Sequence, residues 1–287
     1  MVRIDPALRV ASVRLGVSDL ARSSDFYERV LGLPLVSSDS GAALLGPDPE
    51  RPALELDAIE HATPLPPAST GLFHIAWLHP SRAALAASVR RVVAQRWRFD
   101  GASDHGVSEA LYLTDPDGLG IELYADRPRE RWKRPDAGAG VRMVTLPLDL
   151  EDLLDQDPGG PAHAMPAGTS VGHVHLKVSE VPRATAFYRD ALGFEEQARL
   201  PSAAFLAAGG YHHHVGLNSW QSEGATAAPD TAPGLREVEF ELSGGEAVGD
   251  LEARLAAGPG EESLVRGAGG ELSVRDPDGQ LLTFRHR

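Results

Sequence analysis

The chain of 287 residues contains no cysteine. Thiolate nucleophiles, disulfides and iron–sulfur ligation are therefore excluded, and a bound metal would need histidine and carboxylate ligands. Long apolar runs are also missing, because no stretch approaches the roughly 20 residues that cross a bilayer. The N-terminal segment MVRIDPALRV lacks the apolar part of a secretion signal. We therefore expect a cytoplasmic protein without a membrane partner.

Positive charge is scarce as well. The sequence has 27 Lys and Arg against 41 Asp and Glu, a formal net charge of −14, and it shows no basic stripe. A nucleic-acid partner is therefore not expected. Hydrophobic residues make up 42% of the chain, enough for a sizeable core. The composition favours a globular protein that acts on small molecules.

Two sequence motifs each occur twice, and the distance between the two copies is the same for both. VSDLARSSDFYERVLGLPL begins at Val17 and VSEVPRATAFYRDALGFEE begins at Val178, while DPDG occurs at 115–118 and again at 276–279. Both pairs are offset by 161 residues, from 17 to 178 and from 115 to 276. A shared offset predicts two homologous halves. We expect these halves at 8–126 and 170–287, joined by a Pro- and Gly-rich linker, 127–169, with a short helix at LDLEDLL.

Each half divides into two similar units. A short strand is followed by a helix with apolar side chains at helical spacing, and further strands close the unit. In the second unit, ALYLT and IELYA flank the DPDG turn as a hairpin. The pattern predicts an α+β fold with four βαβββ modules, at 8–58, 71–126, 170–220 and 234–287.

Strand register selects the candidate metal ligands, because alternate residues of a strand point to opposite faces of the sheet. Aligning the first strands of the modules places these residues at one position: Ser12, His74, His173 and Glu237. Aligning the last strands on the DPDG turn places Glu122 against Thr283. His74, Glu122 and His173 together form a set of two imidazoles and one carboxylate. Such a set leaves open positions on Fe(II) for substrate and dioxygen, and Mn(II) could use the same ligands.

The quoted motifs, with VGHVHLKVSEVPRATAFYRDALG and ALYLTDPDGLGIELY, resemble the vicinal-oxygen-chelate superfamily, the glyoxalase/bleomycin resistance/dioxygenase fold. The four-module length resembles its type I extradiol ring-cleaving dioxygenases, the catechol 2,3-dioxygenase-like branch. The resemblance implies four modules that form two barrel-like mixed-sheet units. Glyoxalases and drug-binding proteins share the module motif. A glyoxalase-like metal-dependent isomerase or lyase and a non-catalytic drug-binding protein therefore stay open as alternatives.

The resemblance also implies roles for single residues. His74 and Glu122 match the ligand pair of one module, and His173 matches the single ligand of its partner module. Tyr112, ten residues before Glu122, matches a family tyrosine, and His105 approximates a family histidine that contacts dioxygen or the leaving hydroxyl.

The stretch YHHHVGL matches a family histidine pair, whose second member acts as acid and base toward the substrate. The resemblance makes His214 the analogue of that residue. The match places the three histidines on the last strand of the module, where neighbours point to opposite faces, so we expect His212 and His214 to share a cavity and His213 to face away. His175 shares the strand face of His173 and is expected to line the cavity.

Two module pairings are open at this point. Module four offers only Glu237 and Thr283 at the ligand positions, so we expect modules two and three to pair across the halves into the active unit. The rival pairing joins modules one and two, with Ser12 in place of the second histidine and a carboxylate from Glu55. The first pairing explains His173 and His214 together.

The reaction that the resemblance implies joins a catechol-type or hydroquinone-type aromatic diol with O2. It needs Fe(II) or Mn(II) and no organic cofactor. The expected partners are the diol and O2, with neither nucleic acid nor membrane, and a homo-oligomer stays open.

Overall fold

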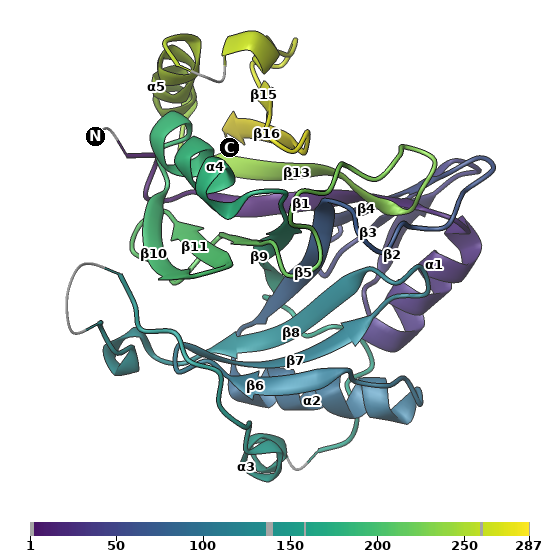
Figure 1. The fold of residues 1–287 in the computed structure, drawn as a ribbon. Helices are drawn as coiled ribbons and strands as arrows, with labels where there is room; N and C mark the ends of the chain where they lie inside the picture. The colour runs from purple at the N-terminus through teal and green to yellow at the C-terminus, as the bar shows by residue number, and fades with distance from the viewer. Residues whose placement is uncertain (1–2, 136–139, 158, 259–260, 287) are drawn as a thin grey trace.

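We examined a computed structural model that describes residues 3–135, 140–157, 159–258 and 261–286. Over these residues, sixteen strands form two eight-stranded sheets, each with parallel and antiparallel neighbours (Figure 1). The first sheet has the order β14-β15-β16-β13-β1-β4-β3-β2 and the second has the order β10-β11-β12-β9-β5-β8-β7-β6. The α+β expectation and the four βαβββ modules are confirmed.

The strands of the first sheet are β1 (Arg9–Val17), β2 (Leu35–Ser38), β3 (Ala42–Leu45), β4 (Leu54–Ala58), β13 (Gly234–Leu242), β14 (Val265–Arg266), β15 (Leu272–Arg275) and β16 (Leu281–His286). Those of the second sheet are β5 (Gly71–His79), β6 (Gly101–Asp104), β7 (Ser108–Thr114), β8 (Gly120–Asp126), β9 (Ser170–Lys177), β10 (Glu195–Leu200), β11 (Ala203–Ala207) and β12 (Val215–Asn218).

The α-helices are α1 (Leu20–Phe26), α2 (Arg82–Ala94), α3 (Leu150–Asp155), α4 (Val181–Ala186) and α5 (Gly245–Ala256). Two π-helical turns, η1 (Tyr27–Leu31) and η3 (Phe187–Ala191), continue α1 and α4, and two 3₁₀ turns are η2 (Arg129–Arg131) and η4 (Glu261–Ser263). The short helix expected at LDLEDLL is α3. None of the helices in the described part of the chain is long and apolar enough to cross a membrane.

Each sheet combines modules from both halves of the sequence. β5 of module two pairs antiparallel with β9 of module three, and β1 of module one pairs antiparallel with β13 of module four. The pairing of modules two and three across the halves is therefore confirmed, and the rival pairing within the first half is wrong. The hydrogen-bonded ladder between β5 and β9 places strands that lie about a hundred residues apart in the sequence side by side.

Side-chain alternation on β5 separates a core face from a polar face. Ile75 and Trp77 are fully buried in the hydrophobic core, where they pack together with Leu85 and Val89 of α2. Figure 1 shows α2 lying against this sheet. His74 points from the opposite face because adjacent strand residues alternate. The amphipathic helix thus covers one face of the sheet and leaves the other face for a functional site.

Candidate metal centre

Three buried side chains on adjacent strands converge at one point. They are His74 on β5, Glu122 on β8 and His173 on β9, and each is at most 6% exposed. His74 Nε2 lies 2.9 Å from Glu122 Oε2 and 3.4 Å from His173 Nε2, while His173 Nε2 lies 3.3 Å from the same carboxylate oxygen. The register brings them together, because Ala76 of β5 pairs with both Glu122 and His173. The small side chain of Ala76 leaves space between its two neighbours.

The electrostatics of this cluster suit a cation. Burial alone would raise the pKa of Glu122, but His173 and His74 outweigh it and hold that pKa well below its ordinary value. Burial also lowers the pKa of His173 to about 4, so its imidazole is neutral at neutral pH. An ionised carboxylate and a neutral imidazole are the forms that bind metals. The donor set of nitrogen and oxygen atoms therefore fits a divalent ion such as Fe(II) or Mn(II).

A cavity of about 730 Å³ opens over one side of this cluster. Its wall contains His74 and Glu122, together with the aromatic side chains of Phe73, Tyr112, Phe205 and Trp220. The ring of His175 also lines the cavity, as expected from its place on β9. An apolar, aromatic cavity with a few convergent polar groups is typical of a small-molecule site. We call it the metal cavity below.

The structure brings Tyr112 and His105 to the same cavity. Tyr112 pairs with Glu122 across β7 and β8, and its hydroxyl lies 2.6 Å from His105 Nε2. His105 Nδ1 lies 2.8 Å from the carbonyl oxygen of Val144, which fixes the ring orientation. Burial and the neighbouring Glu122 raise the pKa of Tyr112 well above its ordinary value, so its hydroxyl keeps its proton.

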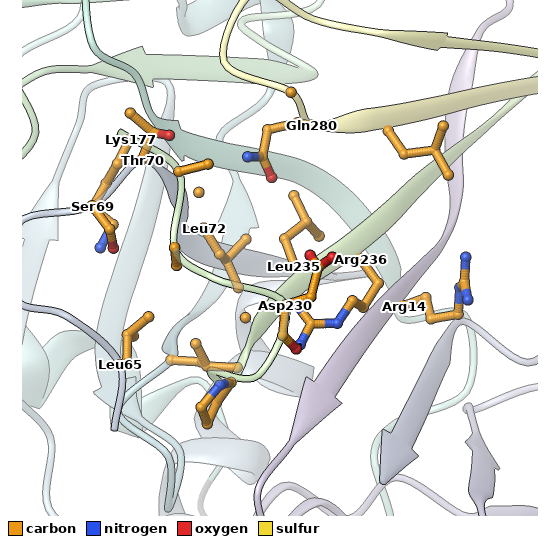
Figure 2. Close-up of a pocket in the computed structure, with 18 of the residues that line it drawn as sticks. Arg14, Leu65, Ser69, Thr70, Leu72, Lys177, Asp230, Leu235, Arg236 and Gln280 are labelled. Carbon is orange, nitrogen blue, oxygen red and sulfur yellow. The ribbon is translucent and has the colours of Figure 1, made fainter. Parts of the chain in front are cut away.

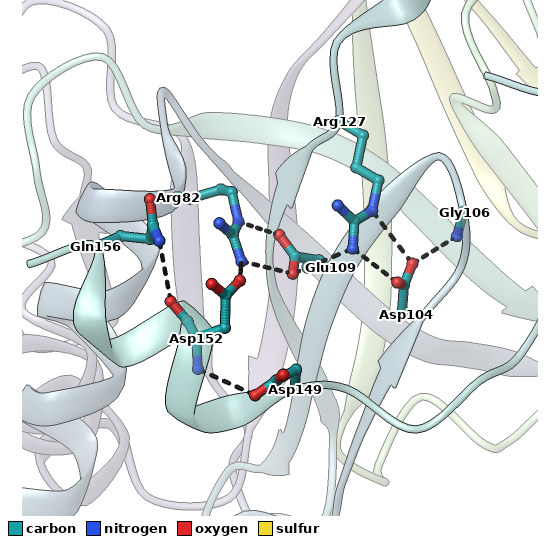
Figure 3. A network of polar contacts seen from close by, with 8 residues as sticks. All are labelled: Arg82, Asp104, Gly106, Glu109, Arg127, Asp149, Asp152 and Gln156. Atoms are coloured by element: carbon teal, nitrogen blue, oxygen red, sulfur yellow. Dashed lines mark hydrogen bonds and ion pairs between the residues drawn. The ribbon is translucent and has the colours of Figure 1, made fainter. Parts of the chain in front are cut away.

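A network of ion pairs supports the turn that carries His105 (Figure 3). Arg127 contacts the carboxylate of Asp104 at 2.6 Å and that of Glu109 at 3.3 Å, and Arg82 also bonds to Glu109. Asp104 also accepts a hydrogen bond from the backbone N–H of Gly106. The residues on both sides of His105 are therefore held in place. Glu109 is 1% exposed, so its bonds to arginine satisfy a buried charge.

The three consecutive histidines do not follow the strand alternation predicted for them. β12 begins only at Val215, after two glycines of positive φ, Gly209 and Gly210, so residues 212–214 precede the strand. His213 lines the metal cavity, and its ring centroid lies 3.9 Å from that of His173. The prediction that His213 faces away is wrong, because alternation holds only within a strand.

His212 and His214 are placed differently from that prediction too. His214 Nδ1 accepts a hydrogen bond from the backbone N–H of Ala208 at 3.2 Å, and its ring packs on Tyr211. His212 Nε2 lies 2.9 Å from a carboxylate oxygen of Asp126. Neither is part of the metal cavity's wall as the described residues define it. The geometry therefore does not support the expected position of His214 in the substrate cavity.

The corresponding positions of the other sheet carry no equivalent cluster among the described residues. Glu237 on β13 accepts hydrogen bonds from Arg14, and Glu239 lies within hydrogen-bond distance of Ser12. Arg14 occupies the place on β1 that His175 occupies on β9. The guanidinium neutralises the carboxylate that would face a metal, so this sheet lacks the donor set of the other one.

The chain is similar to known proteins over most of its length. The sequence profile of the glyoxalase/bleomycin resistance protein/dioxygenase superfamily matches residues 9–123 and 170–284. A catechol-2,3-dioxygenase of Bacillus subtilis (strain 168) is 41% identical over 238 residues, which cover 82% of this chain and 83% of that protein. A lactoylglutathione lyase of Escherichia coli O157:H7 is 28% identical over 142 residues, 47% of this chain and 98% of that enzyme.

Solved structures share the fold at low sequence identity. A protein from Bacillus subtilis subsp. subtilis str. 168 has a TM-score of 0.64 at 14% identity, covering 99% of this chain and 86% of that one. Glyoxalase I from Zea mays has a TM-score of 0.55 at 18% identity, covering 97% of this chain and 92% of that one.

Proposed function

Because this chain belongs to the glyoxalase/bleomycin resistance protein/dioxygenase superfamily, we propose that it is a metal-dependent extradiol ring-cleaving dioxygenase, which acts on catechol-type or hydroquinone-type aromatic diols with O2. The observation that carries the proposal is the convergence of His74, Glu122 and His173, of which the first two line the wall of an aromatic cavity. A facial set of two histidines and one carboxylate leaves coordination positions open. When bound, the metal would supply binding positions for oxygen of the diol, both vicinal oxygens in a catechol, and for dioxygen.

The side chains around the cavity would bind and orient the diol. Phe73, Phe205 and Trp220 offer flat apolar surfaces to an aromatic ring. They also exclude water from the reacting face, which strengthens every polar contact made there. His105 Nδ1 donates to the carbonyl of Val144, so the hydroxyl of Tyr112 donates to His105 Nε2. The phenol oxygen of Tyr112 would then accept a hydrogen bond from a diol hydroxyl at the reacting centre.

We assign the proton-transferring role to His213 in place of His214. The ring of His213 reaches the cavity next to His173, so it could accept a proton from a diol hydroxyl and later return it. His214 Nδ1 is occupied by the backbone N–H of Ala208, on the far side of the segment. Hydrogen-bond reach to the substrate is the first requirement for a general base, and His213 meets it better.

Fe(II) is the metal we propose, with Mn(II) as the alternative, and the protein would act in the cytoplasm.

The proposed function can be tested by reconstitution. Metal-free protein is loaded with Fe(II) or Mn(II) under anaerobic conditions. Catechols and hydroquinones are then added, and oxygen consumption is recorded. We expect oxygen uptake together with the absorbance of a ring-opened product. Bound metal without oxygen uptake across a broad set of diols would contradict the proposal and favour a metal-dependent isomerase.

A further inference from the structure

A second cavity, of about 340 Å³, adjoins the metal cavity. The two cavities share three lining residues: Leu65, Leu72 and Lys177. Figure 2 shows Ser69, Thr70 and Lys177 on one side of this second cavity, with Asp230 and Arg236 facing them. We call it the adjoining cavity, and Lys177 lies at the junction between the two.

Lys177 is a largely buried residue at the wall of both cavities, and its ammonium group has no counter-ion among the described residues. Its side chain lies at the end of β9 and the residue is 7% exposed, and among the described residues no hydrogen bond or ion pair to its ammonium group is found. Burial lowers its pKa, and no carboxylate acts to raise it. Buried charges are normally paired, because desolvation of an unpaired charge is costly. A lysine that stays unpaired in a chain of net charge −14 points to an anion that arrives from outside.

The strand geometry directs Lys177 toward the substrate. His173, His175 and Lys177 alternate along β9, so their side chains leave the same face of the sheet. Four residues of a strand span about 13 Å, so the Lys177 backbone lies roughly that far from the metal ligand His173. The long side chain of Lys177 can bring its ammonium group closer to the metal centre than its backbone lies. An aromatic ring held at the metal centre could therefore reach the ammonium group through a short substituent.

Further cationic side chains line the adjoining cavity, and some of them are paired. Its charged lining residues are Arg14, Lys177, Arg236, Arg275 and Asp230. Arg14 is paired with Glu237 and Asp57. The carboxylate of Asp230 acts on Arg236. Among the described residues, Lys177 and Arg275 are lining cations for which no ion pair is found. The hydroxyl oxygen of Thr70 is buried there without a hydrogen-bond partner. Positive charge and a free hydroxyl together suit a carboxylate group.

We infer that Lys177 binds an anionic substituent of the aromatic diol, so that the preferred substrates are catechols with a carboxylate on a short side chain. This inference rests on the proposed function, since it assumes that the diol ring occupies the metal cavity. The junction of the two cavities would then take part in substrate binding. The carboxylate would lie between the ammonium group of Lys177 and the hydroxyl of Thr70.

Three diols test the inference: catechol, 3,4-dihydroxyphenylacetate, which alone carries a negative charge, and the methyl ester of that acid. The ester keeps the size of the side chain and removes its charge. In Lys177→Met, we expect KM for the carboxylate to rise by about tenfold or more, because a charge-assisted hydrogen bond is lost. KM for catechol and for the ester should change by less than about threefold, and Lys177→Arg should restore part of the effect.

The chain offers a matched control, because its only other lysine, Lys133, is exposed. Lys133→Met should leave all three KM values unchanged. Equal effects of Lys177→Met on the carboxylate and the ester would overturn the inference, and so would an unchanged KM for the carboxylate.

An oxygen-free binding measurement separates this inference from the proposed function. Quenching of tryptophan fluorescence, to which Trp220 at the cavity wall contributes, gives a Kd for each diol without turnover. If no diol supports oxygen uptake by the metal-loaded protein, the proposed function fails. If 3,4-dihydroxyphenylacetate still binds about tenfold more weakly to Lys177→Met than to the unmodified chain, the inference about Lys177 stands. Equal Kd values for the two proteins would overturn it.

Discussion

The phenol oxygen of Tyr27 lies 3.1 Å from a carboxylate oxygen of Asp115, and both residues are buried. Tyr188 and Asp276 form the same contact, also at 3.1 Å, in the second half of the chain. Tyr27 belongs to module one and Asp115 to module two, which lie in different sheets. The two motifs that repeat in the sequence therefore meet in the structure, where each tyrosine joins the two modules of its own half.

Removing either phenol hydroxyl should destabilise the fold. Tyr27→Phe keeps the ring but leaves one oxygen of a buried carboxylate without its donor, so the free energy of unfolding should fall by about 1–3 kcal/mol. Tyr188→Phe should cost a similar amount. Because the two contacts share no partner, the double variant should show the sum of both losses. Urea unfolding of the metal-free protein measures all three. A loss below about 0.3 kcal/mol would show that the hydroxyls contribute little.

The same carboxyls predict a pH dependence of stability. Burial raises the pKa of both Asp115 and Asp276 to about 6, from an ordinary value of 3.8. Between about pH 4 and pH 6 the folded chain thus holds protons that the unfolded chain has released. Their contribution to the free energy of unfolding is present in full below about pH 4 and is lost as the pH rises through about 6.

Asp115→Asn removes one of these titrations. The stability of the unmodified chain relative to this variant should fall by about 3 kcal/mol between about pH 4 and pH 7, since two pKa units correspond to that energy. Urea unfolding of both metal-free proteins across this range measures the difference. A difference that does not vary with pH would rule out a raised pKa at Asp115.

Each proposed metal ligand should be needed for metal binding. His74→Ala, Glu122→Gln and His173→Ala should each reduce bound Fe(II) after reconstitution to below about a tenth of the normal content, because two remaining ligands hold the ion weakly. Elemental analysis of the desalted protein gives the metal content. Tyr112→Phe is the control, since it alters the same cavity without removing a ligand and should keep the metal. Full occupancy in His173→Ala would contradict the assignment across β5 and β9.

The two candidate bases can be told apart by substitution. His213→Ala should keep the metal and lower kcat by about 10²–10⁴-fold, the range typical of a lost general base. His214→Ala should lower kcat by less than about tenfold, because its ring contacts Tyr211 and the backbone of Ala208. Oxygen uptake at saturating catechol, with metal content measured in parallel, decides between them. The opposite order would return the role to His214.

The sequence determined the modules, their repeat and the three candidate ligands. Alternation along β5, β8 and β9 is a local property of an extended backbone, so the faces of His74, Glu122 and His173 could be assigned before any fold was known. The ligand types also favoured one module pairing, because only modules two and three together supply both histidines. The place of His175 at the cavity wall followed from the same alternation.

The tertiary structure decided what depends on contacts between distant segments. The point at which β12 begins is set by its pairing with β9 and β11, and this places His213 at the cavity in place of His214. The contact between Tyr27 and Asp115 lies between sheets, and no strand period predicts it. Lys177 shares the face of His173 by sequence, yet only the packing of the two sheets leaves it largely buried at the junction of two cavities, with no ion-pair partner in the part of the chain that the structure describes. Local periodicity fixes which way a side chain points, whereas its neighbours depend on how the chain closes on itself.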